Sequence, residues 1–286
     1  MAELISGKIV SEKIRNDIKN EIADFKAKWG RTPGLAVIVV GDDPASAVYV
    51  RNKHKACLEV GIESYQIELP STVSEDELLW RIDELNLDNK VNGILVQLPL
   101  PKHISEEKVI NRILPSKDVD AFHPVNVGKI TIGNYDFLPC TPAGIISLLD
   151  YYNVEISGKR CVVIGRSNIV GKPMALLLTE RNGTVTLCHS KTVNLVDICR
   201  EADIIVVAIG RAGFLKTDMV KPGAVVIDVG INRLDNGKLT GDVAFDEVSE
   251  VASMITPVPG GVGPMTITTL LKNTLIAAKK QIEYNI

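Results

Sequence analysis

Short runs of apolar, often β-branched residues alternate with helix-like segments along this chain, and this alternation limits the possible folds more than any other feature. The run Leu-Ala-Val-Ile-Val-Val at 35–40 stands between Gly34 and Gly41. Such a short apolar run is typical of a strand buried on both faces of a parallel sheet. A repeated β-α-β order places helices on both faces of that sheet. The sequence therefore predicts an α/β protein.

Two such series follow each other along the chain, with a loop-rich stretch between them. The first comprises helix 7–29, strand 35–40, a helix capped by Asp43 and running from Pro44 to about Val60, strand 64–69, helix 74–86 and strand 93–98. Residues 99–140 are rich in Pro, Asp and Asn and are expected to form loops. The second comprises helix 142–152, strand 160–164, helix 172–181, strand 184–188, helix 193–200, strands 203–208 and 224–229, and a last helix near 266–283. We therefore expect two α/β domains, 1–140 and 141–264, with the C-terminal segment 265–286 packing back to complete the first.

The overall composition excludes several classes of function. Of the 286 residues, 45% are hydrophobic and 23% are charged, as in a globular protein with a sizeable core. The net charge of -3 and the scattered Lys and Arg residues argue against a nucleic-acid partner or an anionic membrane surface. No apolar run approaches the roughly 20 residues that span a bilayer, and the first residues lack the apolar core of a signal peptide. We expect a cytoplasmic protein.

The five cysteines do not indicate a disulfide framework or a metal site. Their number is odd, and no pair has the C-x-x-C spacing typical of zinc ligands. A free cysteine in apolar surroundings behaves as a small hydrophobic residue, and free thiols fit a reducing compartment. We therefore expect no bound metal, at the following cysteines or elsewhere: Cys57, Cys140, Cys161, Cys188 and Cys199.

A glycine-containing loop in the second half is a candidate dinucleotide site. Residues 160–173 read Arg-Cys-Val-Val-Ile-Gly-Arg-Ser-Asn-Ile-Val-Gly-Lys-Pro, so a predicted strand runs into Gly165 and a helix begins near Gly171. Pyrophosphate binds backbone N–H groups at a helix N-terminus, and glycine lets the backbone approach it closely. The spacing is G-x-S-x-x-x-G rather than G-x-G-x-x-G, but the position between strand and helix favours a Rossmann-type site.

A P-loop and a simple tight turn are two other interpretations of this loop. A phosphate-binding P-loop has four residues between its glycines and a Ser or Thr after the lysine. This loop has five residues between its glycines, and Pro173 stands after the lysine, which disfavours a P-loop. A tight turn between strand and helix can also use glycine for backbone reasons alone, so that explanation stays open.

The end of the next predicted strand indicates which dinucleotide is bound. NAD sites usually carry Asp or Glu about 20 residues after the first glycine, where the acid binds the ribose hydroxyls. Here residues 187–192 read Leu-Cys-His-Ser-Lys-Thr, without an acid. Arg166, Ser190 and Lys191 offer hydrogen-bond donors and positive charge for a 2′-phosphate. The sequence therefore favours NADP over NAD.

Polar residues in the first half mark a candidate reaction centre. Tyr49 and Lys53 are four residues apart on a predicted helix and therefore share a face. Gln97 ends a predicted strand, at the edge where open α/β sheets bind ligands. Asp120 lies in a loop that reads Asp-Val-Asp-Ala-Phe-His-Pro, and residues 256–264 form a loop rich in Pro and Gly. Taken singly, each feature also has a structural explanation, such as a solvated lysine or a capping glutamine.

Taken together, these features resemble the methylenetetrahydrofolate dehydrogenase/cyclohydrolase family, and the resemblance runs over essentially the whole chain. The family usually has Gly after the second Asp of Asp-Val-Asp, whereas this chain has Ala121. A methyl group there costs little unless the residue needs a positive φ. The matching motifs are Tyr49-Val-Arg-Asn-Lys-His-Lys, Gly93-Ile-Leu-Val-Gln-Leu-Pro-Leu-Pro, Lys117-Asp-Val-Asp, Pro139-Cys-Thr-Pro-Ala-Gly, Gly165-Arg-Ser-Asn-Ile-Val-Gly-Lys-Pro and Pro257-Val-Pro-Gly-Gly-Val-Gly-Pro.

The resemblance implies a bifunctional enzyme of tetrahydrofolate interconversion, within one-carbon metabolism and purine biosynthesis. Such an enzyme oxidises 5,10-methylenetetrahydrofolate to 5,10-methenyltetrahydrofolate with NADP and then hydrolyses the product to 10-formyltetrahydrofolate. Domain 1–140 would bind folate and catalyse, domain 141–264 would bind NADP, and the protein would be a homodimer. The alternatives are a monofunctional methylenetetrahydrofolate dehydrogenase, a shikimate-type reductase and a non-catalytic NADP-binding protein.

The resemblance also implies roles for individual residues. Lys53 would be the general acid/base, positioned by Gln97, while Tyr49 would stack on the substrate and Asp120 would accept N–H donors of the pterin ring. These four residues form the implied catalytic set. The implied substrate-binding residues are Tyr49, Lys53, Gln97, Leu98, Pro99, Asp120, Pro257, Gly260, Gly261 and Val262. The implied cofactor-binding residues are Gly165, Arg166, Ser167, Ile169, Gly171, Pro173, His189, Ser190 and Ile231.

Overall fold

A computed structural model describes residues 1–42 and 44–283 of the chain, so Asp43, the expected helix cap, lies outside the described residues. The chain forms two compact units. Unit 1 comprises Met1–Glu12 and Thr141–Thr266, and unit 2 comprises Lys13–Cys140 and Ile267–Ile286. The sequence predicted that residues 1–140 belong to one domain, whereas the first twelve residues join residues 141–266 in unit 1. The reason is a short strand, β1 (Glu3–Leu4), which pairs within the sheet of that unit.

Unit 2 is built on a parallel sheet of three strands in the order β3-β2-β4. All seven residues of the central strand are buried, as its unbroken apolar sequence predicts. The outer strand β3, which is paired along one edge only, has exposed and partly buried residues and no fully buried one. The strands are β2 (Gly34–Val40), β3 (Glu63–Leu69) and β4 (Gly93–Val96).

Helices α2 (Pro44–Val60) and α3 (Glu75–Leu87) follow the first two strands of this sheet, as expected. The expectation that residues 99–140 form only loops was wrong, because α4 (Glu106–Arg112) and α5 (Pro124–Thr131) lie there. Both helices are too short to show a clear apolar period. Side-chain caps stabilise their first turns instead: Ser105 accepts from the Lys108 N–H and His123 accepts from the Val125 N–H.

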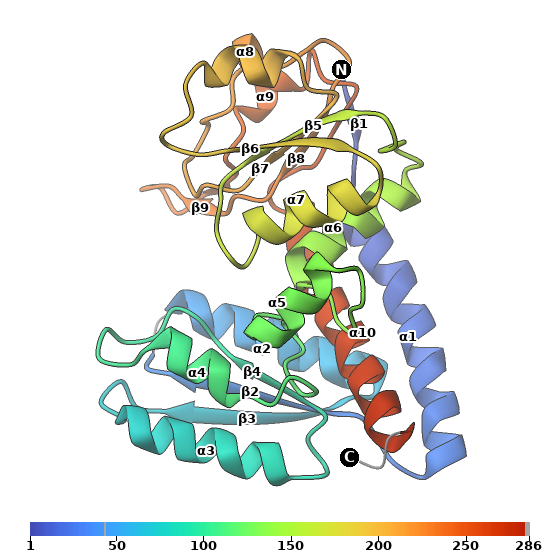
Figure 1. The fold of residues 1–286 in the computed structure, drawn as a ribbon, viewed down its shortest axis with the longest axis vertical. Helices are drawn as coiled ribbons and strands as arrows, with labels where there is room; N and C mark the ends of the chain where they lie inside the picture. Colours follow the sequence, from blue (N-terminus) through green and yellow to red (C-terminus); the bar gives the residue numbers. More distant parts are fainter. Residues whose placement is uncertain (43, 284–286) are drawn as a thin grey trace. The chain divides into compact units, whose positions relative to one another are not determined.

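The long first and last helices, α1 (Gly7–Trp29) and α10 (Val262–Glu283), run alongside each other in unit 2 (Figure 1). Arg15 Nε donates to Thr268 Oγ1 at 3.0 Å. Near the end of α10, the Gln281 amide donates to the Asn92 carbonyl at 2.9 Å and accepts from the Asn92 side chain at 2.8 Å. These bonds confirm that the C-terminal helix packs back on the N-terminal α/β domain, which is unit 2. Within the described part of the chain, no helix is long and apolar enough to cross a bilayer.

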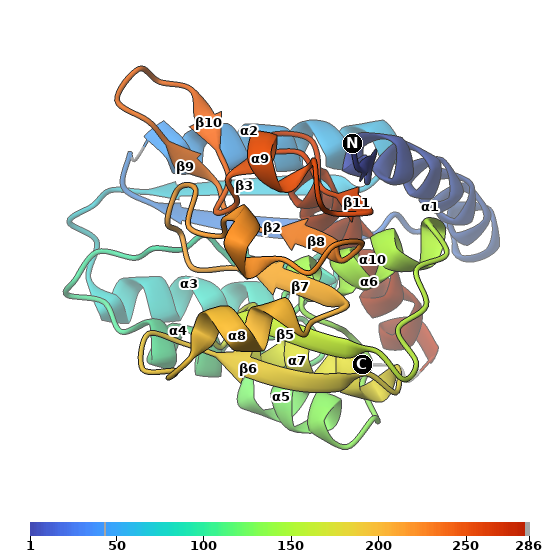
Figure 2. The same ribbon diagram turned by 90° about the horizontal axis from the view of Figure 1, so that it is seen from above.

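Unit 1 contains a six-stranded parallel sheet in the order β1-β11-β8-β7-β5-β6, of which Figure 2 shows the last five strands in sequence. This is the expected Rossmann-type arrangement, in which β5 lies between β7 and β6. The two-residue strands β1 and β11 were not expected, because so short a segment carries no periodic pattern. The remaining strands are β5 (Arg160–Ile164), β6 (Thr184–Cys188), β7 (Ile204–Val207), β8 (Val225–Asp228) and β11 (Met254–Ile255).

Helices and a small hairpin complete unit 1. Helix α6 opens the unit, and α7 and α8 follow β5 and β6 in the β-α-β order that the sequence predicts. The hairpin of β9 and β10 projects from the connection between β8 and β11 (Figure 2). The elements are α6 (Cys140–Tyr151), α7 (Gly171–Glu180), α8 (Leu195–Arg200), the 3-10 helix η1 (Thr217–Met219), β9 (Asn232–Arg233), β10 (Leu239–Thr240) and α9 (Phe245–Val248).

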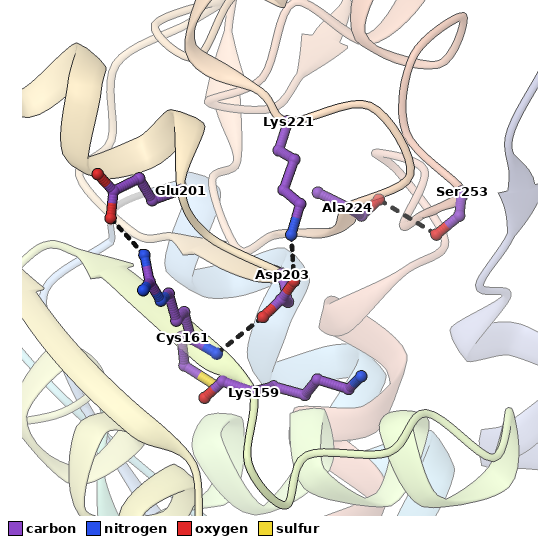
Figure 3. A network of polar contacts seen from close by, with 8 residues as sticks. Lys159, Cys161, Glu201, Asp203, Lys221, Ala224 and Ser253 are labelled. Atoms are coloured by element: carbon purple, nitrogen blue, oxygen red, sulfur yellow. Dashed lines mark hydrogen bonds and ion pairs between the residues drawn. The ribbon is translucent and has the colours of Figure 1, made fainter.

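A polar network ties the strands of unit 1 together at the edge where β5 and β7 begin (Figure 3). The Asp203 carboxylate accepts the Arg160 N–H at 2.9 Å and pairs with Lys221 Nζ at 2.5 Å. The hydrogen bond from Lys221, followed by that from Arg160, holds the pKa of Asp203 below its usual range. This network stabilises the amino-terminal edge of the sheet, opposite the carboxyl edge at which α/β folds bind ligands.

Candidate active site and dinucleotide site

Lys53 on α2 and Gln97 after β4 form the centre of the candidate active site in unit 2. The Lys53 Nζ donates a hydrogen bond of 2.9 Å to Gln97 Oε1, and the lysine is only 9% exposed. The Gln97 amide nitrogen donates to the Leu98 carbonyl at 2.7 Å. Because the nitrogen is held by this carbonyl, the amide oxygen is directed toward the lysine. The structure thus brings together two residues that the sequence predicted as partners.

The surroundings of Lys53 favour its neutral form. Burial lowers the pKa of Lys53, and the nearby Asp120 carboxylate opposes this shift. Burial likewise raises the pKa of Asp120, while Lys53 and a hydrogen bond from the Cys140 thiol work in the other direction. A lysine whose pKa is lowered gives up its proton more readily than an exposed lysine does. The arrangement is therefore suited to acid/base chemistry.

Tyr49 lies one turn before Lys53 on α2, and its side chain is 38% exposed. Residues four apart on a helix lie on the same face, so the partly exposed ring and the buried lysine share one face of α2. Partial burial raises the pKa of Tyr49, which keeps the phenol neutral. A partly exposed, neutral ring beside a buried amine can stack on a flat ligand.

Asp120 is positioned by the strand-like segment that precedes it. Asp118 forms an isolated parallel bridge with Ile94 of β4, so the chain after Asp118 leaves the sheet at the same edge as the residues after β4. Ala121 is fully buried and has a φ of 58°, in the left-handed region. The family's usual glycine at this position is therefore explained by backbone conformation. The buried Asp118 carboxylate holds the turn by accepting from the His123 N–H and the Asn126 amide, each at 2.8 Å.

Two buried residues that the sequence analysis did not assign to the site support Asp120. Burial, followed by the Asp120 charge, raises the pKa of Cys140 well above its usual value, so the thiol stays protonated and donates to that carboxylate. Asn273 on α10 donates to the Val119 carbonyl at 2.8 Å. Cys140 lies in the motif 139–144 that matches the family, so the sequence could have indicated it as a site residue. Nothing in the sequence indicated Asn273. Within the described residues, no group of three His, Cys, Asp or Glu side chains could hold a metal ion.

The Pro- and Gly-rich loop that precedes α10 belongs to unit 1, whereas Lys53, Gln97 and Asp120 belong to unit 2. Its glycines are required by backbone conformation and close packing. Gly260 has a φ of 107°, in a region that favours glycine, and a Cβ on Gly261 would lie 2.6 Å from the Pro257 carbonyl oxygen. Val262 is buried at the start of α10, and Pro257 is partly exposed. A role of these loop residues in folate binding stays a prediction.

The loop between β5 and α7 has the shape of a dinucleotide cradle. Gly165 has a φ of 122°, and a Cβ there would lie 2.2 Å from the Ala208 carbonyl oxygen. A Cβ on Gly171 would lie 1.9 Å from the Gly165 carbonyl oxygen. Both glycines are therefore needed for close backbone approach. Ser167 Oγ accepts from the Val170 and Gly171 N–H groups at 3.2 and 3.3 Å, which fixes the loop at the α7 N-terminus.

The side chains around this loop fit a phosphorylated ribose better than a free one. Ser190 is exposed at the end of β6, in a turn closed by the His189 N–H donating to Thr192 Oγ1 at 2.8 Å. No acid follows the strand, and Arg166 and Lys191 are exposed. Among the other residues predicted to bind the cofactor, Ser167, Ile169 and Ile231 are exposed, His189 is partly buried, and Pro173 is buried within α7. A role of Pro173 in cofactor binding stays a prediction.

Comparison with known proteins shows to which family this two-unit chain belongs. The family model of the tetrahydrofolate dehydrogenase/cyclohydrolase catalytic domain matches residues 5–120, and the model of its NAD(P)-binding domain matches residues 139–282. The chain belongs to the tetrahydrofolate dehydrogenase/cyclohydrolase family. A relative from Acetivibrio thermocellus, named bifunctional protein FolD, is 62% identical over 280 residues, which cover 98% of each chain.

Solved structures of tetrahydrofolate dehydrogenase/cyclohydrolases share the fold over the full length. The bifunctional enzyme FolD from Campylobacter jejuni is 51% identical with a TM-score of 0.96, covering 98% of this chain and 100% of that one. The Trypanosoma brucei methylenetetrahydrofolate dehydrogenase-cyclohydrolase, complexed with NADP and an inhibitor, is 41% identical with a TM-score of 0.95, covering 98% of both. The resemblance seen in the motifs is thereby confirmed.

Proposed function

We propose that this chain oxidises 5,10-methylenetetrahydrofolate to 5,10-methenyltetrahydrofolate with NADP and hydrolyses the product to 10-formyltetrahydrofolate. The observation that carries the proposal is the buried Lys53 amine, held by Gln97 at 2.9 Å beside Asp120, in a chain that also has a Rossmann-type unit. Membership of the tetrahydrofolate dehydrogenase/cyclohydrolase family and relatives named as bifunctional proteins support it.

Lys53 serves the hydrolytic step as a base and then as an acid. The methenyl carbon of the substrate is electrophilic, so a water needs only correct placement and loss of a proton to attack it. The neutral amine takes that proton as the carbon–oxygen bond forms. It returns a proton to N5 as the N5–carbon bond breaks. The new hydroxyl releases its proton to solvent as the carbonyl forms, which leaves the formyl group on N10. Gln97 keeps the amine at the reacting carbon throughout.

The oxidation uses the same folate site together with the Rossmann-type unit. Bound NADP supplies the chemistry by accepting a hydride. The protein residues bind and orient: the Gly165–Gly171 loop and the N-terminus of α7 hold the pyrophosphate, and Arg166, Ser190 and Lys191 bind the 2′-phosphate. Ser167, Ile169, Pro173, His189 and Ile231 complete the proposed cofactor site.

Folate specificity is proposed to come from a stacking surface and a carboxylate. Tyr49 stacks on the flat part of the substrate, where offset contact between rings is favourable. Asp120 accepts adjacent N–H donors of the pterin ring, a two-point match. The folate-binding domain in this proposal is residues 13–140 with 267–286, and the NADP-binding domain is residues 1–12 with 141–266. The other proposed folate contacts are Leu98, Pro99, Pro257, Gly260, Gly261 and Val262.

Absorbance spectroscopy tests both activities in one experiment. Purified protein is mixed with 5,10-methylenetetrahydrofolate, once with NADP and once with NAD. Reduced cofactor that forms faster with NADP, without lasting methenyl absorbance, supports the bifunctional proposal. Accumulation of the methenyl compound supports the monofunctional dehydrogenase instead. No turnover with either dinucleotide contradicts the proposed substrate.

We also propose that the protein works in the cytoplasm as a homodimer and supplies formyl groups for purine biosynthesis. The five cysteines are free and buried, which suits a reducing compartment. The dimer is implied by the family resemblance alone. Light scattering coupled to size-exclusion chromatography measures the molar mass: twice the 31.1 kDa of the chain supports the dimer, and a mass equal to one chain contradicts it.

A further inference from the structure

A fully buried aspartate, Asp242, organises the loop that follows β7. Its exposed fraction is 0%. One carboxylate oxygen accepts from the N–H groups of Ile209 and Gly210 at 2.7 and 3.0 Å. The other accepts from the Arg211 N–H at 2.7 Å and from the Asn232 side-chain amide at 2.9 Å. Three consecutive backbone N–H groups and the side chain of Asn232, at the start of β9, therefore converge on one carboxylate.

A second buried aspartate, Asp228 at the end of β8, holds Asp242 in place. Asp228 Oδ1 accepts from the N–H groups of Asp242 and Gly230 at 2.8 and 3.0 Å, and Oδ2 accepts from the Val243 N–H at 3.0 Å. Two glycines make room for the pair. A Cβ on Gly230 would lie 2.2 Å from Asp242 Oδ1, and a Cβ on Gly241 would lie 1.8 Å from Asp228 Oδ2.

The strand order places this pair at one half of the dinucleotide site. The proposed 2′-phosphate residue Ser190 follows β6, and the proposed pyrophosphate loop follows β5, so the adenosine half of NADP lies over β5 and β6. The other half of the dinucleotide then extends over β7 and β8, on the other side of β5. Gly165 also packs against Ala208, which connects the pyrophosphate loop directly to the loop after β7.

We propose that Asp242, supported by Asp228, is a positioning residue for the nicotinamide half of the dinucleotide, which it serves by fixing loops 209–211 and 230–232. This inference rests on the proposed NADP-dependent oxidation. Within the second of these segments Ile231 is 46% exposed, next to Asn232, whose side chain donates a hydrogen bond to Asp242. Buried backbone N–H groups need acceptors, and here one carboxylate serves three of them. Without it, the loop after β7 loses the bonds that define its shape.

Ligand binding to an Asp242→Asn variant tests the proposal. Asparagine keeps the shape of the side chain but replaces one acceptor oxygen with an amide donor, which faces N–H groups. Calorimetry compares two ligands: NADP, and adenosine 2′,5′-bisphosphate, which lacks the nicotinamide half. We expect NADP affinity to fall by about tenfold or more, the effect of losing charge-assisted hydrogen bonds. Affinity for adenosine 2′,5′-bisphosphate should stay within about twofold of wild type.

A matched control and a second variant exclude a general loss of structure. Asp203→Asn changes another aspartate that accepts a backbone N–H, at the opposite edge of the same sheet, and should leave both affinities unchanged. Asn232→Ala removes one of the four donors to Asp242 and leaves the three backbone bonds. It should weaken NADP binding less than Asp242→Asn, again without affecting the bisphosphate. It serves as the test if Asp242→Asn does not fold.

The outcomes separate this inference from the proposed function. Equal losses for both ligands, or no loss of NADP affinity, would overturn the positioning role. Hydrolysis of 5,10-methenyltetrahydrofolate uses no dinucleotide, so Asp242→Asn should retain it at the wild-type rate while the KM for NADP rises. Wild-type protein that binds neither ligand and shows no dehydrogenase activity would instead contradict the proposed function.

Discussion

The Lys53 amine donates to the Gln97 side-chain oxygen at 2.9 Å, although the two residues are 44 positions apart. Lys53 lies on the helix that follows β2, and Gln97 follows β4, which is paired directly with β2. The sheet therefore sets the distance between them. Because Gln97 is itself held by the Leu98 carbonyl, the lysine has a fixed acceptor in a buried site.

Replacing Lys53 with methionine should abolish cyclohydrolase activity. Methionine preserves the apolar stem but cannot take or return a proton, and general acid/base catalysis contributes about 10²- to 10⁴-fold. The decay of methenyltetrahydrofolate absorbance measures the rate. Lys55→Met, an exposed lysine on the same helix, is the control and should retain full activity. Hydrolysis at the wild-type rate in Lys53→Met would rule out the proposed role.

Replacing Gln97 with glutamate should move the pH dependence of hydrolysis to higher pH. Burial lowers the pKa of Lys53, and a new carboxylate at the position of the amide would stabilise the charged ammonium and raise that pKa. The neutral amine would then become available only at higher pH. The pH profile of kcat measures the shift. Gln97→Leu introduces no charge and should lose activity without the alkaline shift; the same displacement in both variants would contradict this explanation.

Replacing Ser190 with aspartate should reverse the preference for NADP. Ser190 is exposed after β6, where a carboxylate would repel a 2′-phosphate and accept hydrogen bonds from free ribose hydroxyls. The ratio of kcat/KM for NADP to that for NAD should fall by about tenfold or more, since losing one charge-assisted contact costs about that much. Thr184→Asp, at the other end of the same strand, is the control. An unchanged ratio in Ser190→Asp would show that the 2′-phosphate binds elsewhere.

The alanine at position 121 should be nearly as stable as the glycine usual in the family. Relief of the left-handed conformation is worth about 1–2 kcal/mol. The glycine variant is destabilised by about 0.4–1 kcal/mol because its unfolded chain has more conformational freedom. Losing a buried methyl group destabilises it by about another 0.8 kcal/mol. Ala121→Gly should therefore change the free energy of unfolding by less than about 1 kcal/mol.

Ala121→Val provides the contrast. A β-branched side chain is poorly tolerated at a φ of 58°, and the position is fully buried. The variant should lose about 2 kcal/mol or more. Urea-induced unfolding measures both substitutions. A valine variant as stable as wild type would mean that the turn can adopt another conformation.

The stability of unit 1 should depend on pH through Asp228. Burial raises the pKa of Asp228 to about 6. Hydrogen bonds from three backbone N–H groups lower this pKa, and the like charge of Asp242 raises it further. Its folded pKa lies above the unfolded value, so the folded state binds more protons between about pH 4 and pH 6. The free energy of unfolding should fall by up to about 3 kcal/mol as pH rises through that window.

The variant Asp228→Asn isolates this contribution, since an amide has no proton to lose in the window. The difference in unfolding free energy between wild type and variant, measured in urea from pH 4 to pH 7, should shrink or reverse as pH rises. A constant difference would show that the hydrogen bonds from Gly230, Asp242 and Val243 outweigh burial.

Features that depend on neighbouring residues could be predicted from the amino-acid sequence. The apolar run at 35–40 predicted the buried central strand, and the turn from Gly165 to Gly171 predicted a strand leading into a helix. Tyr49 and Lys53 share a helix face because of their spacing alone. Such patterns reflect burial, turn conformation and helix period, which act over a few residues and can be read along the chain.

Contacts between distant segments, in contrast, could not be predicted from the sequence and are seen only in the folded protein. Strand β1 pairs with β11 although about the whole chain separates them, and Asp242 collects donors from the loops after β7 and β8. The left-handed conformation of Ala121 was indicated only by the glycine that the family usually has there. The hydrogen bond from Asn273 to the Val119 carbonyl, next to Asp120, was not indicated by any neighbouring residue. These features arise from sheet register and helix packing, which bring hydrogen-bonding groups together across long sequence separations.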